Sequence, residues 1–323
     1  MSRAVFVRAH GGPEELSVEE RSVGAPGAGE IKVRNRAIGL NFIDTYQRSG
    51  LYQVPLPFVA GNEGAGEVTA VGPGVTDFAV GDRVTYSGPV GAYADERLMP
   101  AGRAARVPEG IDFETAAAIT LKGITAYYLL FQTWQVSEGD TILVHAAAGG
   151  TGSLLVPWAK RLGARVLATA GSPAKVARAK ALGADEAVDY REHDFAPWVR
   201  EVTGGRGVDV VYDGVGRATF EGSLDCLRPR GLMVSFGNAS GPVAVPNLGI
   251  LATKGSLYLT RPSTTTYMAS TEEFRTAVAA VFEAVAAGIL AVSVEQRFPL
   301  AEAAAAHRAL EERRTTGSTV LLP

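Results

Sequence analysis

The spacing of apolar residues divides the chain into three stretches that predict different kinds of structure. Up to about residue 110, short apolar runs alternate with glycine- and proline-rich turns, as at 4–7, 31–34, 64–72 and 82–86. Runs of this length with such punctuation are typical of strands in an irregular β barrel or sandwich. The first stretch therefore predicts a β-rich domain.

The middle stretch begins with an alanine-rich helical pattern, for which Asp112 is a candidate N-cap. From residue 141 onward, apolar runs of the buried type alternate with helical patterns. These runs lie at 141–145, 165–169, 208–212, 231–235 and 256–259. Strands that alternate with helices predict a doubly wound parallel sheet, which makes this part of the chain an α/β domain.

After residue 261 the pattern changes again. Ser270 and Glu273 have the spacing of a capping box and open a helical pattern that stops at Gly288. A strand, a helix and a strand are predicted beyond it, at 292–298, 300–314 and 319–322. This last segment therefore has the elements to rejoin the β-rich domain.

The three stretches set the expected domain organisation. The chain has 323 residues, which is too long for one small module. We expect a β-rich domain over 1–120, an α/β domain over 121–261 and a return segment over 262–323 that completes the first domain.

Composition narrows the class of protein. Lys and Arg number 31 against 34 Asp and Glu, so the net charge of −3 gives no indication of a nucleic-acid partner. The single cysteine, Cys226, excludes a disulfide scaffold and a thiolate-rich zinc or iron–sulfur site. The start of the sequence does not read as a signal peptide, and no apolar run approaches the ~20 residues of a membrane helix. We expect a cytoplasmic protein that makes no membrane contact.

A glycine-rich loop is the strongest local signal. Ala147, Gly149, Gly150, Thr151 and Gly152 follow an apolar run and precede a helical pattern. Glycine lets backbone amides approach a pyrophosphate, and the helix N-terminus contributes partial positive charge. The order of residues departs from the usual Gly-x-Gly-x-x-Gly, and a glycine-rich turn without a ligand is the alternative. With the strand–helix alternation around it, the loop predicts dinucleotide binding.

The residues after the second strand indicate which dinucleotide binds. Enzymes that prefer NAD place a carboxylate there to accept from the ribose 2′-hydroxyl, but here the strand ends in Gly171 and Ser172. The missing carboxylate and the nearby ammonium of Lys175, one turn into the next helix, suit a 2′-phosphate, so we predict NADPH. Lys175 as an ordinary solvated lysine is the alternative, and Asp189 could face a ribose.

Several ordered motifs together resemble the zeta-crystallin-like quinone oxidoreductases of the medium-chain dehydrogenase/reductase superfamily. The motifs are Gly39-Leu40-Asn41-Phe42-Ile43-Asp44-Thr45-Tyr46, Gly50-Leu51-Tyr52, Gly61-Asn62-Glu63-Gly64-Ala65-Gly66-Glu67-Val68, the glycine-rich loop, Phe236-Gly237-Asn238 and Leu259-Thr260-Arg261-Pro262-Ser263. The resemblance implies a GroES-like catalytic domain and a Rossmann-type cofactor domain with a cleft between them. It also implies a homodimer.

The chain departs from the zinc-dependent members of this superfamily at their metal ligands. Asn41 and Asn62 stand where the resemblance places a cysteine and a histidine, and the region around Lys122 lacks the third ligand. An amide is a poor ligand for Zn²⁺. Because alcohol oxidation relies on the metal to deprotonate the hydroxyl, we predict a metal-free enzyme that reduces a quinone or a conjugated carbonyl.

The resemblance also implies roles for individual residues. Asn41, Asp44, Tyr46 and Tyr52 would form the catalytic site, and Thr125 would lie near the nicotinamide ribose. Phe236, Gly237 and Asn238 would hold the nicotinamide side, and Arg261 and Arg313 would reach the cofactor from the return segment. The 2′-phosphate would be surrounded by Gly171, Ser172, Lys175 and Tyr190. Other interpretations stay open. Asp44 could pair with Arg48 on one helix face, Tyr46 and Tyr52 could be surface aromatics, and Arg313 could belong to a solvated charge run.

We predict NADPH-dependent quinone reduction. Reduction of an enone or 2-alkenal by the same site is one alternative, and a non-catalytic, crystallin-like nucleotide-binding protein is another. Among the histidines, His145 ends a buried strand and is interpreted as structural, whereas His10, His193 and His307 are expected at the surface.

Overall fold

The computed structural model describes residues 1–245 and 247–323, which form two compact units. The first unit contains Met1–Ile124, Ser270–Glu283 and Val292–Pro323. The second contains Thr125–Ala269 and Ala284–Ala291. Each unit is therefore assembled from stretches that are separate in the sequence.

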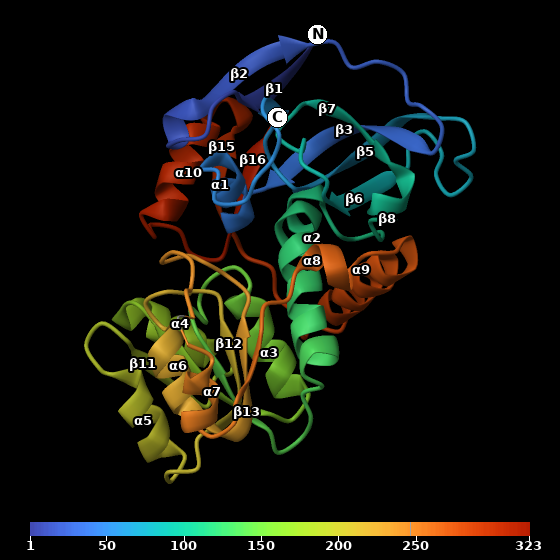
Figure 1. Ribbon diagram of the computed structural model, residues 1–323. Helices are drawn as coiled ribbons and strands as arrows, with labels where there is room; N and C mark the ends of the chain where they lie inside the picture. The colour runs from blue at the N-terminus through green and yellow to red at the C-terminus, as the bar shows by residue number, and fades with distance from the viewer. Residues whose placement is uncertain (246) are drawn as a thin grey trace. The chain divides into compact units, whose positions relative to one another are not determined.

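The strands of the first unit form two sheets (Figure 1). They are β1 (Ser2–Val7), β2 (Leu16–Arg21), β3 (Glu30–Gly39), β4 (Phe58–Val59), β5 (Glu63–Val71), β6 (Arg83–Ser87), β7 (Glu96–Pro100), β8 (Ala104–Arg106), β15 (Val294–Pro299) and β16 (Ser318–Leu322). The larger sheet has the order β15-β16-β3-β5-β6-β8, with β7 also paired to β3, and the smaller has the order β2-β1-β4. β15 and β16 run parallel, and the other pairs are antiparallel.

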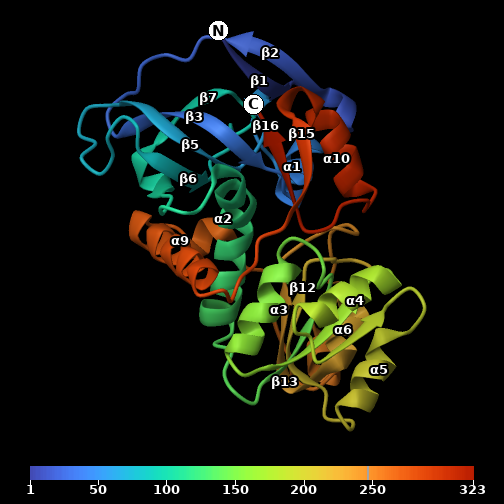
Figure 2. The same ribbon diagram turned by 180° about the vertical axis from the view of Figure 1, so that it is seen from behind.

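The helices of the first unit are α1 (Phe42–Arg48) and α10 (Ala303–Glu311), with 3₁₀ turns at Pro13–Glu15, Ala101–Arg103 and Leu300–Glu302. The boundaries between the units fall inside α2 (Phe113–Tyr128) and α9 (Thr271–Ala286). In both views α10 lies beside α1 and β15, and it packs against both (Figures 1 and 2).

Period-two patterning explains the central strand β3. Ile31, Val33, Asn35 and Ala37 are buried, and the residues between them are partly or fully exposed. At its end, β3 pairs with β16 through Ile38 opposite Leu321. The C-terminal segment thus supplies a strand to the N-terminal sheet.

The second unit contains a parallel sheet with helices around it (Figure 1). Its strands are β9 (Thr141–Val144), β10 (Arg165–Ala170), β11 (Glu186–Asp189), β12 (Val208–Asp213), β13 (Leu227–Ser235) and β14 (Tyr258–Thr260). Its helices are α3 (Gly152–Arg161), α4 (Pro173–Ala181), α5 (Phe195–Val202), α6 (Phe220–Cys226), α7 (Gly249–Thr253) and α8 (Thr264–Tyr267), with a π-helical segment at Leu129–Thr133.

The strand order β11-β10-β9-β12-β13-β14 is that of a doubly wound sheet, as predicted. β9 and β12 are buried along their whole length, which suits strands covered on both faces. The chain leaves β9 toward β10 and later returns to β12 on the other side. The order therefore reverses between β9 and β12, and open α/β sheets bind ligands at the carboxyl ends of the strands beside such a reversal.

Two predicted caps are present. Asp112 Oδ1 accepts from Thr115 N at 2.7 Å, and Ser270 and Glu273 form the reciprocal bonds of a capping box. The predicted helix at 300–314 is too long, since α10 ends at Glu311.

Arg313 explains why α10 stops early. It has a φ of +60°, and the chain closes the helix with bonds from Arg313 N to Leu310 O and from Arg314 N to Ala309 O. This is a Schellman motif with arginine in place of the usual glycine. Within the residues that the structure describes, no helix has the length and apolar character needed to cross a membrane.

Candidate active site

Asn41 and Asp44 lie at the start of α1, where a buried carboxylate gathers hydrogen bonds. Asn41 N donates to Asp44 Oδ2 at 2.9 Å. Asp44 also accepts from Asn62 Nδ2 at 2.7 Å and from the Tyr93 hydroxyl at 3.0 Å. Burial raises the pKa of Asp44 to about 6, although these hydrogen bonds act in the opposite direction. Asp44 therefore exchanges its proton at a pH slightly below neutral.

A line of hydrogen bonds connects Asp44 to the surface of the first unit. The Tyr93 hydroxyl lies 3.0 Å from His307 Nε2, and Arg48 Nη1 lies 3.1 Å from His307 Nδ1. Because a guanidinium only donates, Nδ1 of His307 accepts, so Nε2 carries the proton and donates to Tyr93. Tyr93 then donates to Asp44. Arg48 also forms an ion pair of 2.6 Å with the half-exposed Glu311.

One sequence expectation is wrong at this place, and one alternative is excluded. His307, expected at the surface, is fully buried, and burial together with the charge of Arg48 lowers the pKa of His307 to about 3. Arg48 does not pair with Asp44, because it binds His307 and Glu311 instead. The reason is the packing of α10 on α1, which brings Glu311 to Arg48 across 263 positions of sequence.

A second buried carboxylate lies beside the first. Glu63 is fully buried and accepts from Asn41 Nδ2 at 2.8 Å and from Leu121 N at 2.5 Å. Lys122 Nζ lies 3.4 Å from Glu63 and 3.3 Å from the carbonyl oxygen of Leu40. The ammonium and the amide thus both turn toward Glu63.

The backbone approaches Glu63 closely at Gly39. A Cβ atom there would lie 2.2 Å from Glu63 Oε2 and 2.2 Å from the Ala117 carbonyl oxygen. Only glycine fits between these groups.

Tyr46 and Tyr52 are half-buried and contact each other. Their rings meet edge to face at 5.3 Å, and Tyr52 N donates to Tyr46 O at 3.0 Å. Tyr46 also stacks on Phe42 at 6.1 Å. The two tyrosines therefore form one aromatic group at α1, and their role at the substrate remains a prediction.

The glycine-rich loop occupies the turn from β9 to α3 in the second unit. Ala146 has a φ of +51°, Gly149 N donates to its carbonyl at 2.8 Å, and the neighbouring Ala147 is fully buried. A Cβ atom on Gly152 would lie 2.5 Å from Ala146 O and 2.7 Å from Ala147 Cα. Gly152 is needed for this close approach of helix and strand. Gly149, Gly150 and Thr151 are partly exposed at the helix start, where backbone amides can meet a phosphate.

The residues predicted around the 2′-phosphate gather where β10 and β11 end. Ser172 caps α4 and accepts from Lys175 N at 3.3 Å. Gly171 lies under Tyr190, whose hydroxyl would be 2.6 Å from a Cβ atom at position 171. β10 ends without a carboxylate, and Lys175 is half-exposed on the first turn of α4. This donor set fits a phosphate group.

Asp189 is still able to serve the alternative role, in which its carboxylate faces a ribose. It is 6% exposed at the end of β11, and its Oδ1 accepts from Arg191 N at 3.0 Å. Its Oδ2 is buried and has no hydrogen-bond partner among residues 1–245 and 247–323. Such an oxygen can accept from a ribose hydroxyl.

Phe236, Gly237 and Asn238 follow β13 at the same edge of the sheet. A Cβ atom on Gly237 would lie 2.3 Å from the carbonyl oxygen of Gly214, which follows β12. Arg261 Nη1 donates to Ser235 O at 2.8 Å and to Gly237 O at 3.0 Å. Arg261 thus holds the backbone of this loop.

The last two predicted cofactor residues lie apart in the chain. Thr125 is buried in α2 beside Tyr128, whose ring stacks on Tyr267 at 4.7 Å. Arg313 is exposed in the first unit, at the end of α10. Its left-handed backbone serves the helix end, whatever its side chain contacts.

His145 is buried, as predicted for a structural residue. Its ring nitrogens lie 2.8 Å from Thr169 Oγ1 and 2.9 Å from Ser223 Oγ. Burial lowers the pKa of His145, so the ring is neutral.

The polar cluster of the first unit includes residues that sequence reasoning did not assign. Glu63, Tyr93 and His307 all bind predicted site residues or their direct partners. Glu63 lies within a quoted motif, so its signal was available. Tyr93 lies 49 positions from Asp44 and 214 positions from His307, and no local pattern marks either residue.

Comparison with known proteins places this geometry in a family. Residues 27–138 match the alcohol dehydrogenase GroES-like domain, and residues 182–321 match a model described as zinc-binding dehydrogenase. A quinone oxidoreductase of Pseudomonas aeruginosa is 52% identical, with both chains covered completely. The chain belongs to the quinone oxidoreductase family. The resemblance and the two-domain α/β fold predicted from the motifs are thereby confirmed.

Two further relatives define the range of this family. A solved structure of Escherichia coli quinone oxidoreductase complexed with NADPH has 48% identity, covers 100% of both chains and superposes with a TM-score of 0.98. A 2-haloacrylate reductase of Burkholderia is 48% identical over 100% of this chain and 99% of the relative. Family members therefore reduce acceptors of more than one chemical class.

One matched model is named for zinc, which makes the metal question specific. Nowhere in residues 1–245 and 247–323 do three or more His, Cys, Asp or Glu side chains gather to hold a metal ion. At the two positions where the resemblance places zinc ligands, Asn41 Nδ2 donates to Glu63 and Asn62 Nδ2 donates to Asp44. Their NH₂ groups face carboxylates and offer no lone pair in that direction. A metal-free reaction remains our prediction.

Proposed function

We propose that this protein is an NADPH-dependent quinone oxidoreductase. The observation that carries the proposal is full-length identity of about half to quinone oxidoreductases, one of them solved with NADPH. The local geometry of the second unit supports it, because the loop at Gly152 and the phosphate-type donors near Lys175 suit a dinucleotide with a 2′-phosphate.

NADPH, when bound, supplies the hydride that reduces the acceptor. The residues proposed to hold it are the glycine-rich loop for the pyrophosphate, Lys175 and Tyr190 for the 2′-phosphate, and the Phe236–Asn238 loop for the nicotinamide half. Arg261 keeps that last loop in place through two carbonyl oxygens. The protein's contribution is orientation and exclusion of water, because a quinone is already electron-poor.

The first unit is proposed to face the acceptor. Asp44 and Glu63 fix the side chain and N–H of Asn41 at the start of α1, and Tyr46 and Tyr52 lie on the same helix and just beyond it. A proton for the reduced quinone comes from solvent or from one of these tyrosines. Tyr93 stays protonated, since burial and the Asp44 carboxylate hold the pKa of Tyr93 well above its ordinary value.

The 2-haloacrylate reductase relative supports one alternative, the reduction of an activated alkene. Steady-state NADPH oxidation with benzoquinone, naphthoquinones, 2-alkenals and 2-haloacrylate separates the two. We expect the highest kcat/KM with a quinone. A higher value with an alkene would favour the alternative, and no turnover with any acceptor would favour a nucleotide-binding protein without enzymatic activity.

We also propose that the protein is cytoplasmic and forms a homodimer. Sedimentation of the purified protein tests the second statement, and a monomer at micromolar concentration would contradict it.

A further inference from the structure

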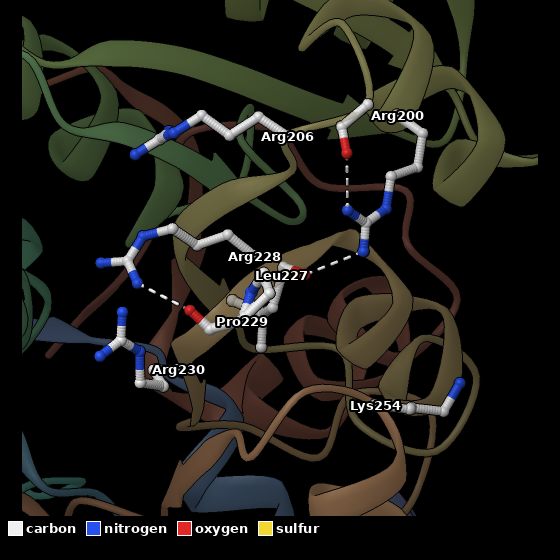
Figure 3. A pocket seen from close by; sticks show the side chains of 8 residues that line it. Arg200, Arg206, Leu227, Arg228, Pro229, Arg230 and Lys254 are labelled. Atoms are coloured by element: carbon white, nitrogen blue, oxygen red, sulfur yellow. Dashed lines mark hydrogen bonds between the residues drawn. The ribbon is translucent and has the colours of Figure 1, made fainter.

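The second unit carries a basic pocket at the edge of its sheet opposite the glycine-rich loop. The pocket has a volume of about 670 Å³ and is lined by Arg200, Arg206, Arg228, Arg230 and Lys254 together with Gly205, Leu227 and Pro229 (Figure 3). These residues precede β12, begin β13 or precede β14, so they lie at the amino ends of the strands. The cofactor residues lie at the carboxyl ends. The pocket is therefore separate from the site described above.

The pocket has more positive charge than its surroundings neutralise. None of the eight lining residues is acidic. Asp209 pairs with Arg206 at 2.7 Å and with Arg228 at 2.5 Å, and Asp225 pairs with Lys254. Burial acts to raise the pKa of Asp209, but hydrogen bonds from the two arginines outweigh it and hold this pKa below its ordinary value. Three of the five cations thus pair with two carboxylates, which leaves three positive charges without compensation.

Two arginines have no carboxylate at all. Arg200 donates to the carbonyl oxygens of Asp225, Gly205 and Leu227 at 2.8–3.1 Å, so it shapes the pocket wall without losing its charge. Arg230 is exposed, and its guanidinium has no hydrogen-bond or ion-pair partner in the part of the chain that the structure describes. In Figure 3 the side chains of Arg206, Arg228 and Arg230 extend toward the same side of the pocket.

We propose that this basic pocket binds a small molecule that carries a di- or triphosphate group. An excess of three positive charges suits a multiply charged anion, and the planar fork of arginine matches phosphate oxygens. The volume lies within the roughly 300–1,000 Å³ of small-molecule sites and exceeds what a single phosphate ion needs. A nucleoside triphosphate and an inorganic polyphosphate share this chemistry.

Calorimetric titration of the NADPH-saturated protein with inorganic tripolyphosphate tests the proposal. Saturation with NADPH keeps the probe away from the glycine-rich loop. We expect saturable binding that weakens as ionic strength rises, because salt screens exposed charges. ATP should bind at least as tightly as tripolyphosphate, and adenosine without phosphates should not bind.

Arg230→Gly is the decisive variant. Arg230 has a φ of +60°, a conformation that glycine adopts without strain, so the fold should be retained and an unchanged melting temperature checks this. Loss of one charge-assisted contact should weaken tripolyphosphate binding by about tenfold. Arg230→Lys should recover part of the affinity. Arg161→Ala is the matched control, since Arg161 is an exposed arginine of the same unit outside the pocket.

Four results would overturn the proposal. The first is that tripolyphosphate does not bind at millimolar concentration, and the second is that Arg230→Gly and Arg161→Ala weaken its binding equally. The third is that citrate binds as tightly as tripolyphosphate, and the fourth is that adenosine binds as tightly as ATP. None of these depends on which acceptor the enzyme reduces.

Discussion

The polar cluster around Asp44 and the glycine-rich loop are built in opposite ways. In the first unit, side chains from α1, from the segment that contains Tyr93 and from α10 meet around buried carboxylates. In the second unit, a continuous stretch of backbone from Ala146 to Gly152 forms the turn that we propose binds the dinucleotide, and small residues allow its close contacts. The geometry of a site made of backbone depends on single glycines. The hydrogen bonding of a site made of buried side chains depends on the protonation state of the whole cluster.

The largest expected effect is at the backbone site. Gly152→Ala places a methyl group 2.5 Å from Ala146 O, and neither that atom nor Ala147 Cα can yield without moving the loop. If the loop must return to its parent position to bind NADPH, overpacking of about 1–3 kcal/mol lowers NADPH affinity by about 5- to 150-fold. Fluorescence titration with NADPH measures the change.

Gly24→Ala is the control for this substitution, because Gly24 is exposed and a Cβ atom there meets nothing within 4 Å. Its NADPH affinity should equal that of the parent. Unchanged affinity in Gly152→Ala would show that the loop does not carry the dinucleotide.

The buried cluster around Asp44 and His307 should change how the free energy of unfolding depends on pH. The folded-state pKa of Asp44 is raised, so its ionised form destabilises the fold and stability returns as pH falls through about 6. The folded-state pKa of His307 is lowered, so its contribution is present above the unfolded pKa near 6.5 and is lost as pH falls below it. The two effects oppose each other in the parent protein.

Variants separate these contributions. From pH 7 to 5, Asp44→Asn should lose about 2 kcal/mol of unfolding free energy through His307, and His307→Gln should gain about 1 kcal/mol through Asp44. Gln keeps one donor and one acceptor for Tyr93 and Arg48. Urea denaturation at both pH values, compared with the parent, cancels other titrating groups. Identical pH profiles for the three proteins would contradict the protonation states assigned here.

A smaller effect is expected on cofactor preference at Lys175, in the first turn of α4. NADPH should bind about tenfold or more tightly than NADH, and Lys175→Ala should narrow this ratio, since it removes one charge-assisted contact to the 2′-phosphate. Lys180→Ala, an exposed lysine on the same helix, should leave the ratio unchanged. Equal affinity of the parent for both cofactors would instead favour a ribose contact of Asp189.

No effect is expected from metal removal. Exhaustive dialysis against a chelator should leave quinone reduction intact, because Asn41 and Asn62 direct NH₂ groups at carboxylates. Elemental measurement of the dialysed protein is the control. A loss of activity that added Zn²⁺ restores would refute the metal-free reaction.

The sequence predicted elements well where neighbours in the chain determine structure. The strand–helix alternation, the Asp112 cap and the Ser270–Glu273 box all depend on residues a few positions apart. Sequence-based prediction failed where contacts between distant residues determine the structure. His307 has polar neighbours in sequence, but α10 buries it against Tyr93 and Arg48. The early end of α10 also differs, because Arg313 adopts a left-handed conformation that its residue type does not favour.

By itself, the sequence determined the two-domain α/β class, the position of the glycine-rich loop and the family, because periodicity and glycine spacing act through local backbone geometry. The tertiary structure decided which carboxylates are buried, which tautomer His307 adopts and where unneutralised arginines gather. Burial and long-range hydrogen bonds set these properties, and they depend on which segments pack together rather than on the order of residues in the chain.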